Sequence, residues 1–205
     1  MPDSPSPAGT LLPRRAVLAL FPAALGTFVL GALGCKGSPT IVVPEIPDEP
    51  LPDESPARAF VGSYRFVGGD VERAAVDRAI DTAIADMNGL VRGIARDRLV
   101  AANGVPSELA IVGGGNLLAV VVDRLPYTGR LDGIATKVKT STGDVMDMRY
   151  QIGPIIEQVF FDSEKGRVNR FELRGTQLVM HVRVHAQVLP REVVYDLTFE
   201  RVVPA

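Results

Sequence analysis

Apolar and polar residues alternate along most of the second half of the chain, as expected of β-strands that bury one face. In residues 177–189, every even position from Leu178 to Val188 is apolar, whereas most odd positions carry polar or charged side chains. Turn-forming residues separate such segments at spacings of about ten residues. The pattern predicts strands at residues 60–67, 108–112, 116–123, 134–140, 145–152, 155–162, 167–174, 177–189 and 192–202.

Residues 70–102 have a different period, with apolar side chains at steps of three and four residues, which is the spacing of a helix with one buried face. Asp70 is the expected N-cap, and Asn103 marks the expected end. A single helix over this region would be about 45 Å long. Because Gly89 follows Asn88 and offers a break, one long helix and a helix pair both remain open.

Strands that follow one another along the chain favour an antiparallel meander, and closure of the meander into a barrel removes its two exposed edges. The predicted fold is therefore mainly β, with one long helix or a helix pair. We expect an up-and-down antiparallel β-barrel of 8–10 strands with the helix inserted between the first and second strands. The alternative is an open antiparallel sheet packed on the helix, an α+β arrangement.

Residues 1–34 show the three zones of an export signal: a polar start that ends in Arg14 and Arg15, an apolar run over residues 16–33, and small residues before Cys35. The sequence Ala-Leu-Gly-Cys that ends at Cys35 resembles the bacterial lipobox, in which a peptidase cuts before the cysteine and acyl chains are attached to it. An uncleaved transmembrane anchor is the alternative, since the run is about long enough to span a bilayer. The arginine pair resembles a twin-arginine export motif and also fits an ordinary Sec signal, so both export routes stay open.

The lipobox resemblance implies that Cys35 is a lipidation site that anchors the protein in a membrane of the bacterial cell envelope, on the periplasmic side or in the outer membrane. Cys35 is the only cysteine, which excludes a disulfide within the chain. Residues 35–56 are rich in proline and acidic residues, which predicts a disordered tether. The expected organisation is a signal peptide at 1–34, this lipidated tether at 35–56, and a barrel domain at 57–205.

The chain has a formal net charge of −2, and its excess of acidic residues lies in the predicted tether. The predicted domain contains no run of lysine and arginine interleaved with aromatic residues, so the charge pattern predicts no nucleic-acid partner. A chain of this size buries about two-thirds of its surface on folding, which is enough for a core without disulfides.

No residue pattern in the chain indicates catalysis or metal binding. His181 and His185 are the only histidines, and on a strand they lie about 13 Å apart, too far to bind one metal ion. Gly113-Gly114-Gly115 lacks the residues that follow in a phosphate-binding loop and is expected to form a hairpin turn. No Gly-x-Ser-x-Gly motif occurs. We therefore expect no metal, no cofactor and no enzymatic activity.

Gly62-Ser63-Tyr64 in the first predicted strand is a Gly-x-aromatic signature, and helical residues follow it before the remaining strands. These features resemble the calycin superfamily, the lipocalins and fatty-acid-binding proteins, over residues 60–202. The resemblance implies an up-and-down barrel around an apolar cavity. Fatty-acid-binding proteins carry Arg-x-Tyr in the last strand to hold a carboxylate. Here Arg201 is followed two places on by valine, so that anchor is not carried over.

Apolar side chains that face the interior either form a packed core or line a ligand cavity, and the pattern leaves both open. Arg201 continues the apolar face of the last strand toward the strand end, where the charged head of a ligand would lie near water. The candidate ligand-binding residues are Tyr64, Met148, Tyr150, Phe171, Tyr195, Phe199 and Arg201.

Two functional hypotheses follow from the predicted anchor and barrel. The first is a membrane-tethered lipoprotein whose barrel cavity binds a lipid or another apolar small molecule. The second is a structural or assembly lipoprotein of the cell envelope, which has no ligand cavity and binds a protein partner through its exterior. A cavity distinguishes the two, because only the first requires one.

Overall fold

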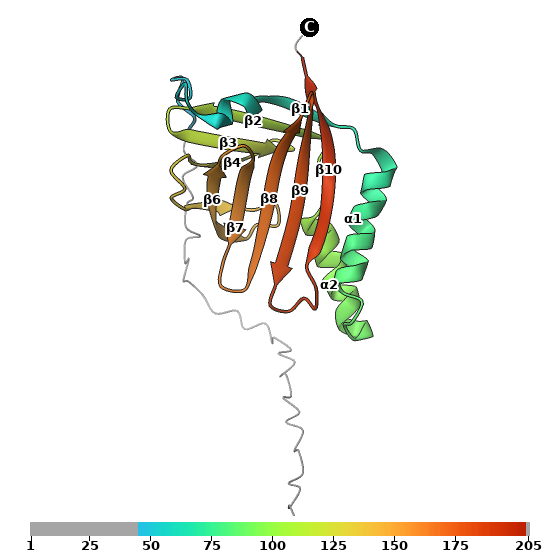
Figure 1. Ribbon diagram of the computed structural model, residues 1–205. Helices are drawn as coiled ribbons and strands as arrows, with labels where there is room; N and C mark the ends of the chain where they lie inside the picture. Colours follow the sequence, from blue (N-terminus) through green and yellow to red (C-terminus); the bar gives the residue numbers. More distant parts are fainter. Residues whose placement is uncertain (1–44, 204–205) are drawn as a thin grey trace, which may run out of the picture. The chain divides into compact units, whose positions relative to one another are not determined.

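The computed structural model describes residues 45–203, which form a β-barrel with a pair of α-helices on one side (Figure 1). The predicted signal peptide and Cys35 lie outside the described residues, as does the first part of the predicted tether. In the part of the chain that the structure describes, no helix has both the length and the apolar character needed to cross a bilayer.

Antiparallel strands form a single ten-stranded sheet, in which the first strand also pairs with the last. The spatial order is β4-β3-β2-β1-β10-β9-β8-β7-β6-β5, the order of an up-and-down barrel. The predicted barrel of 8–10 strands is thus confirmed, with the helices between β1 and β2. The strands are β1 Gly62–Phe66, β2 Glu108–Gly114, β3 Leu117–Val122, β4 Leu125–Arg130, β5 Thr136–Lys139, β6 Val145–Ile152, β7 Ile156–Phe161, β8 Lys165–Arg174, β9 Gln177–Ala186 and β10 Val193–Val202.

The barrel is nearly closed, because β4 and β5 form the two ends of the sheet and share no ladder of hydrogen bonds. Cα atoms of β4 and β5 still come within 8 Å of each other, as do Cα atoms of β4 and β6. The two strands therefore face each other across a seam. Side chains must hold this seam, since the backbone ladder does not.

The strand β4 is missing from the set that the alternation pattern predicts. It contains Pro126, which a strand tolerates at the edge of a sheet. Asp123 and Arg124 form its two-residue turn with β3, and their φ angles of 44° and 71° are those that a type I′ turn requires. Because Asn-Gly or Asp-Gly usually marks such a turn, the pair Asp-Arg did not indicate one.

The helical region folds as a pair, α1 (Gly69–Ala83) and α2 (Gly89–Ala102), which settles the choice between one helix and two. The break lies at the expected position, because Asn88 caps α2. Its side chain accepts a hydrogen bond from the Val91 amide at 3.1 Å. The second helix ends before Asn103, as the sequence predicts.

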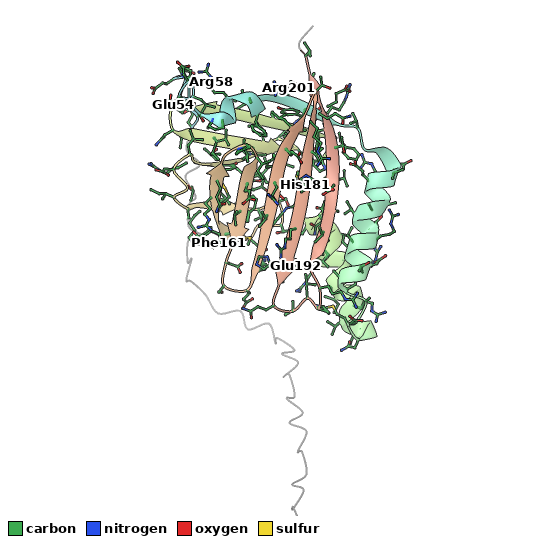
Figure 2. All side chains as sticks on the ribbon, viewed as in Figure 1. Glu54, Arg58, Phe161, His181, Glu192 and Arg201 are labelled. Atoms are coloured by element: carbon green, nitrogen blue, oxygen red, sulfur yellow. The ribbon has the colours of Figure 1, made fainter. Side chains whose placement is uncertain are left out.

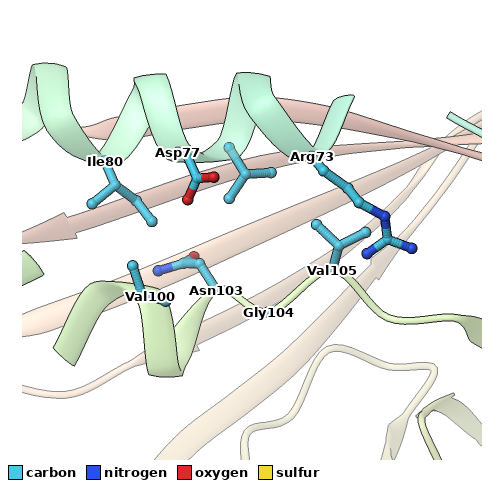
Figure 3. Close-up of a pocket in the computed structure, with 8 residues that line it drawn as sticks. Arg73, Asp77, Ile80, Val100, Asn103, Gly104 and Val105 are labelled. Atoms are coloured by element: carbon cyan, nitrogen blue, oxygen red, sulfur yellow. The ribbon is translucent and has the colours of Figure 1, made fainter. Parts of the chain in front are cut away.

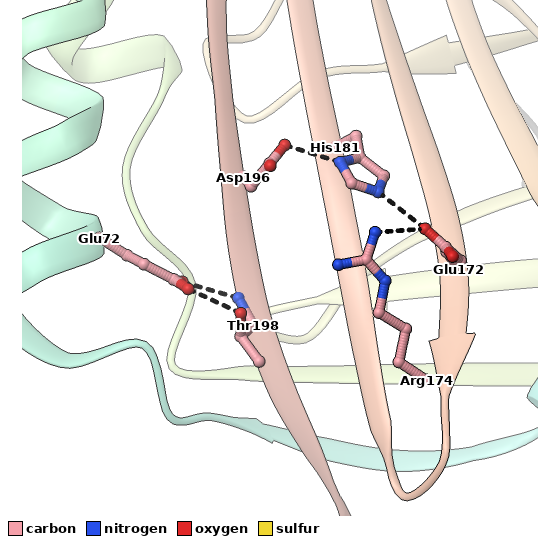
Figure 4. A network of polar contacts seen from close by, with 6 residues as sticks. All are labelled: Glu72, Glu172, Arg174, His181, Asp196 and Thr198. Atoms are coloured by element: carbon pink, nitrogen blue, oxygen red, sulfur yellow. Dashed lines mark hydrogen bonds and ion pairs between the residues drawn. The ribbon is translucent and has the colours of Figure 1, made fainter.

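The start of α1 differs from the prediction, since Gly68 occupies the N-cap position and Asp70 lies in the first turn. Glu72 in the same turn accepts hydrogen bonds from the amide and the hydroxyl of Thr198, at 2.7 and 2.6 Å (Figure 4). These bonds tie α1 to β10 beyond the end of β1. The helix therefore covers the part of β10 that β1 is too short to reach, and it buries Val76, Ile80 and Ala83 there.

Residues 45–56 pack against the barrel, although their composition predicts a disordered tether. They run along the β2–β3 hairpin and lead into the 3-10 helix η1 (Pro56–Phe60). Leu51 is only 5% exposed and belongs to the core, and the Gly115 amide donates to the Glu49 carbonyl at 2.8 Å. The packed region thus begins before the predicted domain boundary, because one buried leucine and one backbone hydrogen bond hold this segment in place.

Candidate functional site

The predicted ligand-binding residues gather in the barrel core, where six of the seven side chains are at most 5% exposed and only Arg201 is half-buried. The structure therefore brings together residues from four strands, as the alternation implies. Contact between these residues and a ligand stays a prediction. The six buried residues are Tyr64, Met148, Tyr150, Phe171, Tyr195 and Phe199.

Side chains fill the barrel between β4 and β6. A Cβ atom added at Gly129 would lie 3.0 Å from both Met148 Cε and Tyr150 Cδ2, so there is no free space at this position. Nearby, the rings of Tyr127 and Phe160 pack edge to face, with centroids 5.1 Å apart. The interior at this level is a packed core, with a density that excludes a ligand unless side chains move.

The Tyr150 hydroxyl, fully buried, bridges the seam between the two ends of the sheet. It donates to the Tyr127 carbonyl at 2.6 Å and accepts from the Val120 amide at 3.1 Å. Val120 and Tyr127 are partners in the β3–β4 ladder, so this hydroxyl of β6 joins the β3–β4 pair from inside. Burial raises the pKa of Tyr150 well above its ordinary value, so the hydroxyl keeps the proton that it donates.

A chain of hydrogen bonds runs from Tyr150 through the barrel interior. Gln158 Nε2 donates to the Tyr150 hydroxyl at 3.0 Å, and Asn169 Nδ2 donates to Gln158 Oε1 at 2.9 Å. The Nε atom of Arg167 then donates to Asn169 Oδ1 at 2.8 Å. Buried amides require such partners, and in this barrel the partners lead from the seam to an arginine.

Arg167 lies half-buried at the far end of this chain, on the interior side of β8. Its guanidinium donates to the Ala102 carbonyl at 3.1 Å, and it approaches Asn103 Oδ1 and the Tyr195 hydroxyl, both at 3.4 Å. All these partners are neutral. Among residues 45–203 no carboxylate oxygen lies within 4 Å of the Arg167 nitrogens. A cation withdrawn from water without a counter-ion favours the binding of an anion.

Arg167 is not among the site residues that the sequence pattern predicts. The relevant signal is the alternation along the strand, which places Arg167 on the same face as Asn169 and Phe171, and these two residues are buried. A charged residue on a half-buried strand is usually taken to face water. The two interior amides, Gln158 and Asn169, show that this barrel carries polar side chains on its inner face.

A small pocket opens between the helix pair and the chain that leads into β2 (Figure 3). Its volume is about 150 Å³. Asn103 is 2% exposed, lines this pocket and accepts a hydrogen bond from the Tyr195 hydroxyl at 3.0 Å. The pocket thus ends at the group that also contacts Arg167. Its lining consists of Arg73, Val76, Asp77, Ile80, Val100, Asn103, Gly104 and Val105.

Tyr195 and Arg167 do not line this pocket, but both contact Asn103, which does, so two hydrogen-bond donors lie next to its lining. Burial raises the pKa of the Tyr195 hydroxyl above its ordinary value, and the charge of Arg167 opposes that shift. The hydroxyl is therefore protonated at neutral pH. A carboxylate placed between the two side chains would accept hydrogen bonds from a phenol and a guanidinium, the strong charge-assisted kind.

Arg201, the predicted head-group residue, is engaged elsewhere, near the end of β10 (Figure 2). Its guanidinium donates to the Ala59 carbonyl at 2.5 Å and to the Tyr64 hydroxyl at 2.7 Å, and it lies 5.3 Å from the centre of the Tyr64 ring. These bonds tie β10 and β1 to η1. Ligand binding by Arg201 stays a prediction. Its partners, like those of Arg167, are neutral: a backbone carbonyl and a tyrosine hydroxyl.

His181 lies on the outer side of β9, within a cluster of charged side chains (Figure 4). Its Nδ1 is 2.7 Å from an oxygen of Asp196, and its Nε2 is 3.2 Å from Glu172, which also accepts from Arg174 at 2.8 Å. Hydrogen bonds from Arg174, which has the larger effect, and from His181 lower the pKa of Glu172 to about 2. Within residues 45–203 there is no group of three or more histidine, cysteine and acidic side chains that could hold a metal ion.

No protein-family model matches the chain, and no curated protein matches it. Solved structures with a similar course of the chain include fatty-acid-binding protein 1 of Echinococcus granulosus, at 15% identity and a TM-score of 0.47, covering 71% of this chain and 99% of that one. A fatty acid binding protein of Schistosoma mansoni in complex with arachidonic acid matches at 16% identity and a TM-score of 0.45, covering 71% and 97%. The fluorescent protein UnaG matches at 14% identity and a TM-score of 0.48, covering 71% and 99%. At these values the likeness concerns the course of the chain and not its ligand.

Proposed function

We propose that the protein is a membrane-tethered lipoprotein of the cell envelope whose barrel binds an apolar small molecule with an acidic head group, such as a fatty acid. The observation that carries the proposal is Arg167, a half-buried guanidinium on the inner face of the barrel with only neutral partners. A carboxylate placed beside Arg167, next to Asn103 of the pocket lining, would neutralise this charge. The apolar part of the ligand would extend from there among the core side chains.

The energetic case for an acid at Arg167 rests on partial desolvation of the charge. A hydrogen bond to a charged group contributes about 1.5–3 kcal/mol, roughly twice the value for a neutral pair. The existing partners of Arg167 are one backbone carbonyl oxygen, the side-chain amide oxygens of Asn103 and Asn169, and a tyrosine hydroxyl at long range. A carboxylate replaces the weakest of these contacts at little cost, because the two contacts at 3.4 Å are barely formed.

The ligand would gain access by displacement of α2. A site for a drug-sized ligand usually measures about 300–1,000 Å³, and the pocket of about 150 Å³ is smaller than that. α2 has no buried side chain, so its removal from the barrel uncovers little core. Its apolar side chains at Leu90 and Ile94 are 82% and 52% exposed. A helix held by so few buried contacts is suited to act as a lid over the pocket.

Apolar contacts would set the affinity, and the head group would set the orientation. Burying about ten methylene groups at roughly 0.8 kcal/mol each gives about 8 kcal/mol before the costs of association. This corresponds to a micromolar dissociation constant at best. Displacing packed side chains lowers the affinity further, so we expect binding in the micromolar range or weaker.

The membrane tether in this proposal rests on the residues before the barrel. The export signal and the small residues before Cys35 support acylation of that cysteine. Two or more acyl chains hold a protein on a membrane almost permanently. A barrel fixed in this way would take up or deliver its ligand close to the bilayer in which such ligands dissolve.

A structural or assembly role is the second candidate, and the packing of the interior favours it. The core between β4 and β6 is filled, and every buried polar side-chain atom among residues 45–203 has a hydrogen-bond partner. Such a barrel is stable without a ligand. In this case the exterior would bind an envelope protein, and Arg167 would serve only to join β8 to the end of α2.

Displacement of a fluorescent fatty-acid probe tests the two candidates. In Arg167→Met, which keeps an unbranched apolar stem without the charged guanidinium, we expect a fatty acid to bind roughly ten- to a hundredfold more weakly. The methyl ester of the same acid, which has no charge to pair, should bind almost as it does to the wild type.

Arg170→Met is the matched control, since Arg170 lies on the outer side of the same strand and pairs with Glu157 at 2.8 Å. It should leave both affinities unchanged. If the acid and the ester weaken alike in Arg167→Met, Arg167 holds the fold and not the head group. If no apolar probe binds the wild type, the structural role replaces the proposal.

A further inference from the structure

The three glycines at the β2–β3 hairpin lie directly against residues 46–51, which we call the strap. A Cβ atom added at Gly114 would lie 2.1 Å from the Pro47 carbonyl oxygen and 2.8 Å from that of Glu49. Real Cβ atoms essentially never approach backbone so closely, so only glycine permits the contact. The turn prediction for this motif therefore describes only part of its role.

The neighbouring glycines extend this surface to both sides. An added Cβ at Gly113 would lie 2.8 Å from two methyl carbons of Leu51, and one at Gly115 would lie 3.2 Å from Pro47 Cγ. The Gly115 amide donates to the Glu49 carbonyl at 2.8 Å. Leu51 is 5% exposed and belongs to the core. The contact thus combines a backbone hydrogen bond, a buried apolar anchor and close approach of two backbones.

These features are those of a peptide-binding site. Extended peptides bind through backbone hydrogen bonds and side-chain pockets, and proline reduces the conformational freedom lost on binding. The strap contains Pro47 and Pro50, with Leu51 as the side chain that enters the core. Most of the strap is otherwise exposed, so the glycine surface and the Leu51 contact hold it in place.

We propose that Gly113-Gly114-Gly115 is a binding site for the chain's own strap, and that docking of the strap sets how far the barrel stands from the membrane. The second half of this proposal rests on the proposed lipid anchor at Cys35. With the strap docked, the ten residues 36–45 limit the distance from Cys35 to the strap to about 36 Å, the reach of a fully extended chain. With the strap released, the 21 residues 36–56 raise this limit to about 75 Å. The docked strap therefore holds the β2–β3 hairpin close to the bilayer.

Hydrogen exchange on the full chain in lipid vesicles tests the binding site. Gly114→Ala places a methyl group close to the Pro47 carbonyl, so exchange of the Gly115 amide, which donates to the strap, should become roughly tenfold faster or more. Leu51→Ala removes the strap side chain that packs into the core, so it weakens the same contact and should have the same effect. Gly93→Ala is the control, because a Cβ atom there meets nothing within 4 Å, and exchange should be unchanged.

Energy transfer from a fluorophore on the barrel to a labelled lipid tests the distance. We expect transfer to fall in Gly114→Ala and in Leu51→Ala, and to stay at the wild-type value in Gly93→Ala. Unchanged exchange of the Gly115 amide in both Gly114→Ala and Leu51→Ala would refute the binding site. Faster exchange with unchanged transfer would refute the control of distance. Absence of transfer in the wild type would contradict the lipid anchor, while the exchange result would still decide the binding site.

Discussion

The substitution Tyr150→Phe tests how the barrel is closed at its seam. It removes one hydroxyl and leaves the ring, so the packing against Met148 and Gly129 is retained. The change leaves the Val120 amide, the Tyr127 carbonyl and the Gln158 amide group without the partner that all three share. Its effect on stability therefore reports the contribution of these hydrogen bonds.

The magnitude depends on how far the strands readjust. A buried polar group left without a partner costs about 1–3 kcal/mol. Val120 and Tyr127 face each other in the ladder and can bond to each other if β3 and β4 close up, which leaves Gln158 alone. With partial closure we expect a loss of about 3 kcal/mol, equivalent to a decrease of about 6–12 °C in Tm for a domain of this size.

Chemical and thermal unfolding, followed by circular dichroism, measures the loss. Met148→Leu is the matched control, since it changes the same strand and the same face without touching a hydrogen bond. A swap that conserves volume should cost less than about 1.5 kcal/mol. If Tyr150→Phe costs less than the control, the hydroxyl does not hold the seam, and the reasoning about its partners is refuted.

Three further predictions address the anchor, the helix pair and the charged cluster. Cys35→Ser should release the protein from membranes and abolish incorporation of labelled fatty acid; labelling that persists in the variant would contradict acylation at Cys35. Asn88→Ala should destabilise the start of α2 by about 1 kcal/mol, which urea unfolding would detect; an unchanged midpoint would show that the cap is dispensable. The pKa of Glu172 is lowered from 4.5 to about 2 in the folded protein, so this group stabilises the fold above pH 4.5, and its contribution is lost as the pH falls from 4.5 toward 2. In Glu172→Gln this part of the acid-induced loss should be missing, whereas a pH profile identical to that of the wild type would argue against the shifted pKa.

Periodicity predicted most of the fold, because it reports which face of each element is buried. The alternation that includes Leu178 and Met180 reappears as the buried face of β9, and the helical period before Asn88 reappears as the buried face of α1. It failed at β4, which contains a proline and follows a turn of Asp123 and Arg124 without glycine. Because β4 forms one side of the seam, the arrangement of strands at the seam could not be predicted without it.

The candidate site was predicted only in its apolar part. Aromatic and methionine positions follow from alternation alone, since an apolar side chain on a half-buried strand faces inward. Arg167 and Gln158 were assigned to no site, because a polar side chain faces inward only when partners on other strands and helices satisfy it. Asn103, on which both the pocket and Tyr195 converge, comes from a helix end that no strand pattern connects to the barrel.

The strap shows a different limit of sequence reasoning. Its proline and acidic content is typical of an unfolded linker. An average composition does not reveal the effect of one residue, here the leucine that anchors the strap. From the sequence alone, the motif Gly113-Gly114-Gly115 predicts only a turn. The reason for three consecutive glycines becomes visible when the Pro47 carbonyl is found 2.1 Å from the position of an added Cβ.

Native mass spectrometry of the purified protein shows directly what the barrel binds. We predict a complex of one protein with one small acidic molecule, either retained from the cell or formed on addition of a long-chain fatty acid, and loss of that complex in Arg167→Met. A spectrum that contains only the free protein after addition of a saturating fatty acid would contradict ligand binding by the barrel.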